Sequence, residues 1–296
     1  MKVITAALCL WILYHFTSTF CIQQTDGFSV ARIHSELSYN PDWEIAPLSS
    51  DKQKQIENIL SQEFRYMACG GQCFAFSSTD DQYVIKFFKH RIRKPYSYFY
   101  ALSLPQFLDS TRKRKLDKAL FKMSRDFTSY KIAYDDLQDE TGLEYIHLNK
   151  TQAPKESVVI IDKLGIKHSI KLDDIEFVVQ KKADLVYPRF DELKKQADPL
   201  KIEQAMRSMI DVIVARCKKG YFDEDPKIHR NFGFTGDQPV IIDVGRFVRD
   251  DKRKEPSVYK ADVSIIIKRL REWLEETHPE LVDTLDKELY AFQNEN

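Results

Sequence analysis

One segment, residues 220–247, constrains the chain more than any other: G-Y-F-D-E-D-P-K-I-H-R-N-F-G-F-T-G-D-Q-P-V-I-I-D-V-G-R-F. Asp198-Pro199 predicts a helix start ahead of it, and apolar residues recur at helical spacing up to Gly220, where the helix should end. Beyond the acidic loop, a turn at residues 235–238 and an apolar run at 240–242 predict a hairpin with a buried second strand.

This order of elements is expected to bring three polar side chains together: Asp225, Asn231 and Asp243. Amide and carboxylate oxygens suit Mg²⁺, and a further carboxylate can accept a hydroxyl proton. The spacing of these residues therefore predicts a phosphoryl-transfer site in this segment.

The segment resembles the catalytic loop and magnesium loop of the protein-kinase-like fold, where a glycine, a catalytic Asp, an Asn and a D-x-G Asp follow a helix. Asp225 falls where the family has its catalytic Asp, Asn231 matches the metal-binding Asn, and Asp243-Val244-Gly245 matches D-F-G. The H-R-D triplet is absent, and one extra residue separates Asp225 from Asn231. Asp223 and Asp225 therefore both remain candidates for the catalytic position.

The front half of the chain contains a predicted hairpin and a third strand. Residues 64–76 predict two strands around a glycine turn, and residues 83–89 predict the next strand. Lys86 lies inside that hydrophobic strand, where an ammonium group is costly unless it meets an anion. Val84-Ile85-Lys86 resembles the family's V-A-I-K element, and residues 70–75 resemble a degenerate glycine loop. The resemblance implies that Gly70, Gly71 and Lys86 contact the phosphates of ATP.

A long helix is predicted at residues 112–137, where the kinase-like family has helix C and the glutamate that pairs with the strand lysine. No glutamate lies between Ser110 and Gln138, which indicates weakened or altered catalysis. The available carboxylates are Asp117, Asp126, Asp135 and Asp136. The basic run at residues 112–115 is interpreted as the solvated face of this helix, and the aromatic stretch at 96–100 as packing residues.

The expected fold class is α+β, a two-lobed protein-kinase-like fold with a small antiparallel-sheet N-lobe and a reduced, mainly helical C-lobe. A chain of 296 residues with 43% hydrophobic residues can bury a core of that size. After an extended lead-in at residues 22–49, the N-lobe is expected at 50–182 and the C-lobe at 183–296. Further strands are predicted at 143–148, 157–161, 168–172 and 177–180, and Asp262 resembles the family's structural Asp on helix F.

The first 21 residues have the basic start, apolar middle and small-residue exit of a secretory signal cleaved near Cys21. An uncleaved single-pass anchor is the alternative, since the run from Val3 to Ile22 approaches the length of a bilayer-spanning helix. We therefore expect a secreted or extracytoplasmic protein, working where nucleotide is supplied. The three cysteines left after cleavage, Cys69, Cys73 and Cys217, are too few for a disulfide framework.

Basic and acidic residues both number 45, so no nucleic-acid partner is expected, and a membrane only if the first segment stays uncleaved. The expected cofactors are ATP and Mg²⁺, and the acceptor is an unspecified protein or small molecule. A pseudokinase that keeps the fold as a binding module without turnover is the competing class, favoured by the degenerate loop and the missing glutamate.

A third class is a papain-type cysteine protease, because residues 69–74 resemble its C-G-[SA]-C-[WY] segment with one residue too many. That family needs a His and then an Asn about 130 to 150 residues downstream. His229 lies slightly beyond that window, and Asn231 follows it by only two positions. A base and its orienting residue so close in sequence fit the required geometry poorly.

Overall fold

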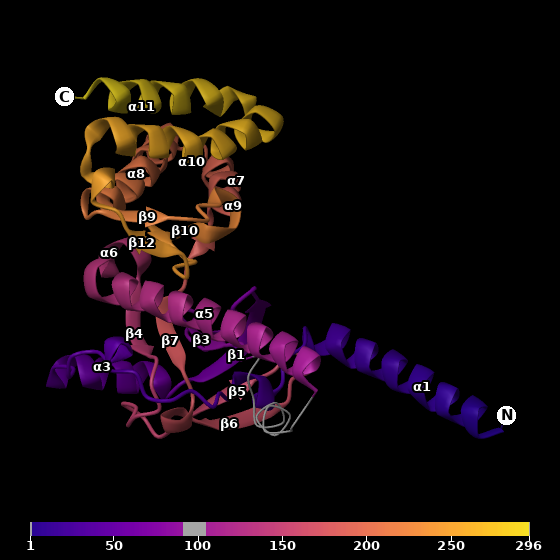
Figure 1. The fold of residues 1–296 in the computed structure, drawn as a ribbon. Coiled ribbons are helices and arrows are strands. Elements are labelled where there is room, and N and C mark those ends of the chain that lie inside the picture. Colours follow the sequence, from indigo (N-terminus) through magenta and orange to yellow (C-terminus); the bar gives the residue numbers. More distant parts are fainter. Residues whose placement is uncertain (1, 91–104, 296) are drawn as a thin grey trace. The chain divides into compact units, whose positions relative to one another are not determined.

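The computed structural model describes residues 2–90 and 105–295, and its fold is α+β with a mixed sheet (Figure 1). The chain divides into two compact units, one formed by Met1–Leu120 with His147–Val179 and the other by Phe121–Ile146 with Gln180–Asn296. The predicted aromatic packing stretch at residues 96–100 lies outside the described residues.

The first unit is built mainly from strands. Its strands are β1 (Glu63–Cys69), β2 (Cys73–Ser78), β3 (Tyr83–Phe88), β5 (Ser157–Ile161) and β6 (Lys167–Lys171). Its helices are α1 (Lys2–Thr25), α2 (Val30–Ile33), η1 (Pro41–Trp43), α3 (Ser50–Leu60) and η2 (Leu172–Asp174). Three elements contain a boundary between the units: α5 (Gln106–Asp136), β4 (Leu143–His147) and β7 (Phe177–Lys181).

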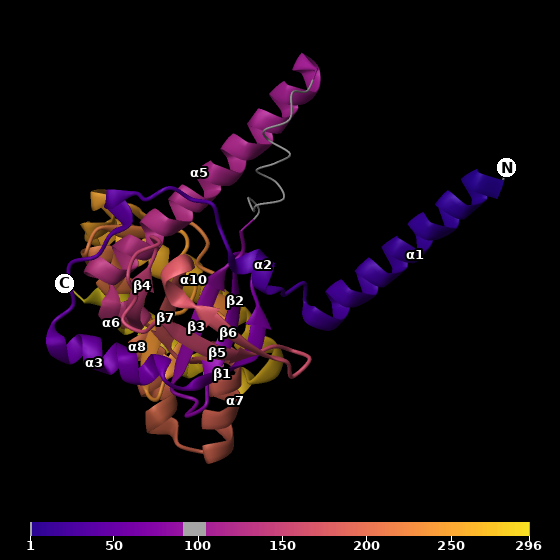
Figure 2. The same cartoon turned by 90° about the horizontal axis from the view of Figure 1, so that it is seen from below.

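Seven of the described strands form one sheet in the order β4-β7-β3-β2-β1-β5-β6. Figure 2 shows these strands from below. The expectation of a small antiparallel sheet is wrong, because β1 pairs with β5 in parallel, with Phe64 opposite Ile160. Between these two strands the chain passes through β2, β3, α5 and β4, and a connection of that length permits a parallel neighbour. The β5–β6 hairpin then extends the sheet beyond β1.

Aromatic residues on alternate strand positions form the core of the first unit. Phe74, Phe76 and Phe87 are completely buried on one face of the sheet, since Phe74 and Phe76 alternate along β2 and Phe87 lies opposite Phe74. The Phe28 ring packs edge-to-face against Phe74 and Phe76, with ring centroids 5.2 and 5.3 Å apart.

The lead-in segment, residues 22–49, is extended only in part, because its first four residues end α1 and residues 30–33 form α2. From residue 26 on it packs along the first unit through its backbone and its side chains. Asn40 N–H donates to Asn149 Oδ1, and Asn149 Nδ2 donates back to Asn40 O, both at 3.0 Å. Further along the lead-in segment, Ile33 and Trp43 are buried.

The second unit is mainly helical, with two small sheets. Its helices are α6 (Gln138–Thr141), α7 (Val186–Gln196), α8 (Pro199–Lys218), α9 (Ile228–Asn231), η3 (Asp251–Lys254), α10 (Pro256–Thr277), η4 (Pro279–Leu281) and α11 (Val282–Asn294). Its strands are β8 (Asp184–Leu185), β9 (Tyr221–Asp223), β10 (Phe232–Thr235), β11 (Gln238–Ile241) and β12 (Phe247–Arg249).

Helix α8 forms as its sequence predicts. Pro199 occupies its first turn, and the Asp198 side chain caps it by accepting a bond from Lys201 N–H at 3.2 Å. Met206, Met209 and Ile213 are buried on one face, and α10 and α11 lie alongside (Figure 1). The helix ends before Gly220, whose φ of +84° is costly for any other residue.

Measured against the length and hydropathy that a bilayer-crossing segment needs, no helix within residues 2–90 and 105–295 qualifies.

Candidate functional site

The predicted glycine loop is the turn between β1 and β2. Cys69 is opposite Phe74 in the strand register, and Gly70 N–H donates to Cys73 O at 3.0 Å. Neither glycine has a left-handed φ, and a Cβ added to Gly71 would meet no atom within 4 Å. The conformation of this turn therefore does not itself require glycine.

Lys86 lies half-buried in β3, directly opposite Ala75 of β2. The alternation of strand side chains places Lys86, Ala75 and Cys73 on one face of the sheet. The small Ala75 leaves the long lysine stem room on that face. Lys89 belongs to the opposite face, where its Nζ donates to Cys69 Sγ at 2.8 Å and to Gly70 O. The sequence analysis did not identify Lys89 as a second lysine beside the glycine turn, although the alternation of side chains along a strand places it on the face opposite Lys86.

In the second unit, two short pairings bring the ends of the acidic loop together. Strands β9 and β12 pair antiparallel, with Asp223 opposite Phe247, and Glu224 N–H donates to Arg246 O at 3.1 Å. At the other end of the loop, Ile242 N–H donates to Asn231 O at 2.7 Å. The segment that carries Asp243 is thereby tied to both ends of the loop.

Asn231 and Asp225 are joined by a direct bond inside the loop. Asn231 Nδ2 donates to Asp225 O at 2.6 Å, and Asn231 is only 4% exposed. Asp225 is half-buried, and its Oδ1 lies 2.7 Å from Lys227 Nζ. The buried Asn231 amide therefore closes the loop by a hydrogen bond, and the Asp225 carboxylate beside it reaches solvent.

Asp223 is almost fully enclosed, at 1% exposed. Its Oδ1 accepts a bond from Asp225 N–H at 2.9 Å, and its Oδ2 lies 3.8 Å from Arg216 Nη1, too far for a hydrogen bond. Burial raises the pKa of Asp223 to about 6, against the effects of Arg216 and the Asp225 amide. The Asp243 and Asp225 carboxylates add to the shift, which indicates a cluster of negative charge at this end of the loop.

A buried ionic network lies beneath Asp223. The completely buried Arg216 has its Nη2 4.0 Å from Asp262 Oδ2, and Asp262 Oδ1 accepts from Arg253 Nη1 at 2.6 Å. The Arg253 guanidinium also covers the Phe222 ring, 3.9 Å from its centroid. Asp262, which resembles the family's helix F aspartate, is thus connected to the acidic loop through arginines.

The Asp243-Val244-Gly245 turn is held from within and by α5. Gly245 N–H donates to Asp243 Oδ1 at 3.3 Å. The buried Ser129 of α5 donates its hydroxyl to Val244 O and accepts from Phe247 N–H at 2.6 Å. Sequence reasoning missed Ser129, because the partners of a lone helical serine cannot be read from local spacing.

Of the four aspartates proposed for the missing glutamate position, Asp126 lies in the electrostatic range of Asp243. Burial raises the pKa of Asp126, Arg125 and Arg246 oppose the shift, and the Asp243 carboxylate adds to it. The Asp126 carboxylate accepts from Arg125 Nη2 at 3.0 Å. Asp135 pairs with Lys131 and Asp136 accepts the Tyr221 hydroxyl, so these two have other structural partners.

Within the described ranges, no group of three or more His, Cys, Asp or Glu side chains is arranged to hold a metal ion.

The protease reading finds no support in the second unit. His229, the candidate base, is exposed on α9 beside the Tyr187 ring, and among the described residues no hydrogen bond joins it to Asn231. Cys69 and Cys73 are both free thiols.

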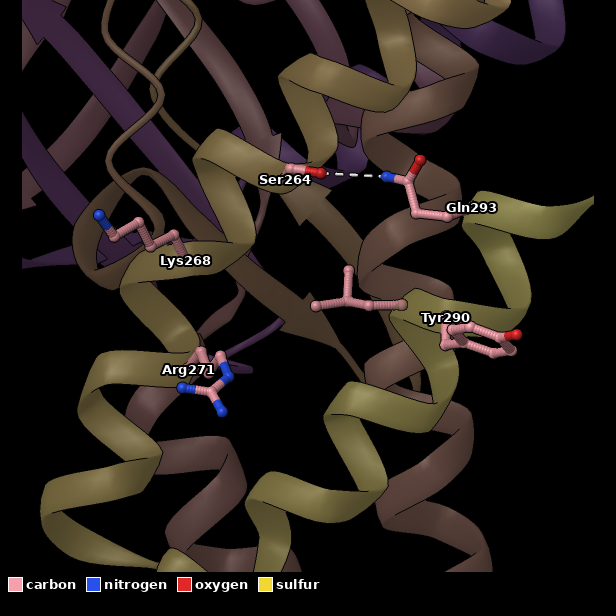
Figure 3. Close-up of a pocket in the computed structure, with 6 residues that line it drawn as sticks. Ser264, Lys268, Arg271, Tyr290 and Gln293 are labelled. Atoms are coloured by element: carbon pink, nitrogen blue, oxygen red, sulfur yellow. Dashed lines mark hydrogen bonds between the residues drawn. The ribbon is translucent and has the colours of Figure 1, made fainter.

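A surface pocket of about 330 Å³ lies between α10 and α11, away from all of these residues (Figure 3). It is lined by Ser264, Lys268, Arg271, Leu289, Tyr290 and Gln293. Gln293 Nε2 donates to Ser264 Oγ at 3.0 Å across it, and Arg271 is paired with Asp286. The predicted site residues do not line it.

Comparison with protein families finds none that matches, and comparison with curated proteins finds no match either. Among solved structures, the chain is similar to WbdD in complex with the kinase inhibitor LY294002, with 14% identity and a TM-score of 0.35. That alignment covers 75% of this chain and 45% of WbdD, which another structure describes as a bifunctional kinase-methyltransferase. Rv3197 of Mycobacterium tuberculosis, in complex with erythromycin, shows 14% identity and a TM-score of 0.29 over 97% of this chain and 75% of that one.

This chain spans less than half the length of WbdD. TM-scores this low mark only a weak likeness.

Proposed function

We propose that the chain is an atypical, two-lobed kinase-like protein that binds ATP with Mg²⁺ and transfers the γ-phosphate to a hydroxyl acceptor. The observation that carries this proposal is the 2.6 Å bond from Asn231 Nδ2 to Asp225 O, in a loop tied at both ends to the Asp243 segment. The bond uses the amide nitrogen inside the loop. The amide oxygen, which is the atom that suits Mg²⁺, is then the one left for a ligand.

Asn231 and Asp243 are the proposed protein ligands of the metal. The remaining coordination would come from phosphate oxygens and water, as is usual for Mg²⁺ at nucleotide sites. When bound, the cation would neutralise charge on the phosphates. The protein's own contribution is to fix Asp243 through Gly245 N–H and to fix the turn through Ser129.

Asp225 is the better of the two candidates for the catalytic position. An acceptor hydroxyl must come within hydrogen-bond reach of the catalytic carboxylate, and Asp225 is half-buried whereas Asp223 is 1% exposed. Asp223 Oδ1 accepts from Asp225 N–H, so we assign Asp223 the role of a positioning residue. Lys227, 2.7 Å from Asp225 Oδ1, would have to yield to an acceptor.

In the first unit, we assign Lys86 to the phosphates and the Gly70-Gly71 turn to covering them. The open space over Gly71 supports this assignment, because a close ligand would supply the reason for glycine that the turn conformation lacks.

The test is thermal unfolding of the full chain with and without ATP and Mg²⁺. We expect a ligand-dependent rise in melting temperature that is lost in Lys86→Ala and in Asp243→Ala. Asp237→Ala is the matched control, since Asp237 is an exposed aspartate of the same hairpin region, paired only with Arg189 on α7. An equal rise in Asp243→Ala and in the wild type would rule the metal assignment out.

The second candidate is a pseudokinase that binds nucleotide without turnover. Two observations favour it: α5 offers only Asp126, already bonded to Arg125, in place of a glutamate, and Asp225 is engaged by Lys227. Measuring phosphate release or transfer in the preparation that binds ATP separates the two candidates. Binding with no transfer to any protein or small-molecule acceptor would favour the pseudokinase.

We also propose that the protein is exported and that residues before Ile22 are removed. The basic start, apolar middle and small-residue exit of the first 21 residues support this proposal. N-terminal sequencing of the protein recovered from a secreting host tests it. An intact Met1 in that material would favour the anchored alternative.

A further inference from the structure

Helix α5 carries an unusual line of basic side chains. With 3.6 residues per turn, Arg114, Lys115, Lys118, Lys122 and Arg125 all fall within an arc of about 100° around the helix axis. We call these five residues the basic stripe. They extend over about 17 Å of one continuous helix, and no acidic residue between Arg114 and Arg125 lies within the arc.

The charges of the basic stripe are largely uncompensated. Among the ion pairs of the described residues, none involves Arg114, Lys115, Lys118 or Lys122; only Arg125 is paired, with Asp126. Helix α10 shows the usual alternative. There Lys268 and Arg269 both pair with Glu272 one turn on, and Arg271 pairs with Glu275 and Asp286.

This contrast matters because the chain as a whole has no net charge. Like charges one turn apart on a helix repel and destabilise it slightly, so the basic stripe is unfavourable in the free protein. An anionic partner would turn that repulsion into attraction.

An exposed aromatic residue, Phe121, indicates which class of anionic partner fits the basic stripe. Phe121 is 69% exposed and lies one turn from both Lys118 and Arg125, and Leu120 beside it is 39% exposed. On the opposite side of the helix, Leu116, Ala119 and Met123 are half-buried. Basic side chains around a protruding Phe fit a surface that has anionic groups outside and apolar material beneath.

We propose that the basic stripe with Phe121 is a docking surface for anionic membrane lipid. The lysine and arginine groups bind lipid phosphate and carboxylate, and the Phe121 ring enters the boundary between headgroups and acyl chains. The proposal is independent of nucleotide binding and of the fate of the first 21 residues.

The test is sedimentation of the full chain with vesicles of phosphatidylcholine alone and with about 30% phosphatidylserine added. Because α1 exposes apolar side chains of its own, the informative quantity is the ratio of the two affinities. We expect the wild type to prefer the anionic vesicles and to lose that preference as salt rises.

The triple variant Lys115→Glu, Lys118→Glu, Lys122→Glu should lower the affinity for anionic vesicles about a hundredfold and leave that for neutral vesicles unchanged. Phe121→Ser should lower it about tenfold. The matched control reverses three exposed lysines elsewhere, Lys54, Lys195 and Lys201, with the same total charge change. All altered side chains are exposed, so equal melting temperatures would show that the variants fold.

Equal binding of the stripe variant and the control variant to anionic vesicles would overturn the proposal. So would tighter, stripe-dependent binding to duplex DNA than to the vesicles, which would assign the basic stripe to nucleic acid instead.

Discussion

Gly71 and Asn231 differ in how closely the surrounding atoms contact them. No atom lies within 4 Å of a Cβ placed on Gly71, whereas Asn231 is 4% exposed and bonded through both its amide nitrogen and its backbone oxygen. The acidic loop is therefore fixed around Asn231 by its own hydrogen bonds, whereas the glycine turn leaves open space above Gly71.

The largest expected effect is on the rate of phosphoryl transfer and comes from Asp225, whose carboxylate reaches solvent in the acidic loop. Asp225→Asn should lower phosphoryl transfer by about 10²- to 10⁴-fold while leaving the ATP-dependent rise in melting temperature in place. Asp223→Asn should lower transfer only about tenfold, since Asp223 acts through the Asp225 amide. Transfer rates measured at saturating ATP would decide. The reverse order of the two variants would give the catalytic position to Asp223.

The next expected effect is on the free energy of unfolding and comes from Ser129, which holds the Asp243-Val244-Gly245 turn. Ser129→Ala removes a hydroxyl that serves Val244 O and Phe247 N–H, and it leaves both groups buried without that partner. We expect a loss of about 1–3 kcal/mol in the free energy of unfolding. Urea unfolding measures it, with Thr128→Ala on the exposed side of the same helix as control. Identical stability of the two variants would contradict the assigned role of Ser129.

A pH series tests the enclosed carboxylate. The pKa of Asp223 is raised from 3.8 to about 6, so between these values the folded protein binds a proton that the unfolded chain has released. The contribution of Asp223 to stability therefore falls as pH rises through that window, by up to about 3 kcal/mol. Urea unfolding of wild type and Asp223→Asn from pH 4 to 7 should give a difference that grows with pH. A difference that stays constant would mean that the carboxyl titrates normally.

The smallest expected effect on stability is at the open turn. Gly71→Ala should change the free energy of unfolding by no more than about 0.5 kcal/mol, yet weaken ATP binding about tenfold if phosphate lies close above the turn. Gly233→Ala is the contrasting variant in the second unit, because the added Cβ would lie 2.5 Å from Asp184 O. We expect that variant to lose more than about 1 kcal/mol. Calorimetric titration of ATP into Gly71→Ala checks the binding, and unchanged affinity would remove the turn from the site.

Local patterns predicted most of the regular elements. The period of two in β2, the apolar run of β3, the Asp-Pro start of α8 and the turn before β11 all act over a few residues, so the sequence displays them directly. The parallel pairing of β1 with β5 could not be read, because it depends on where a distant hairpin adds to the sheet. The sheet was expected to be antiparallel for that reason.

The site roles of Asp223, Asp225, Asn231 and Asp243 stay predictions from their intervals in one short segment. Within that segment, Asp223 Oδ1 accepts from Asp225 N–H and Asn231 Nδ2 donates to Asp225 O. Ser129 and Arg216 were missed, since each serves the loop from another helix and neither belongs to a local pattern. Strand β9 is three residues long, too short for periodicity to reveal.

The lead-in segment sets a limit on any maturation of the chain by proteolysis. Asp26 accepts bonds from Tyr66 and Lys163, and Phe28 closes over the rings of Phe74 and Phe76. A cut after Cys21 would leave these contacts intact. Removal of seven more residues would delete Asp26 and Phe28 and expose the rings of Phe74 and Phe76. A processing enzyme could therefore remove about one further helical turn without losing these contacts.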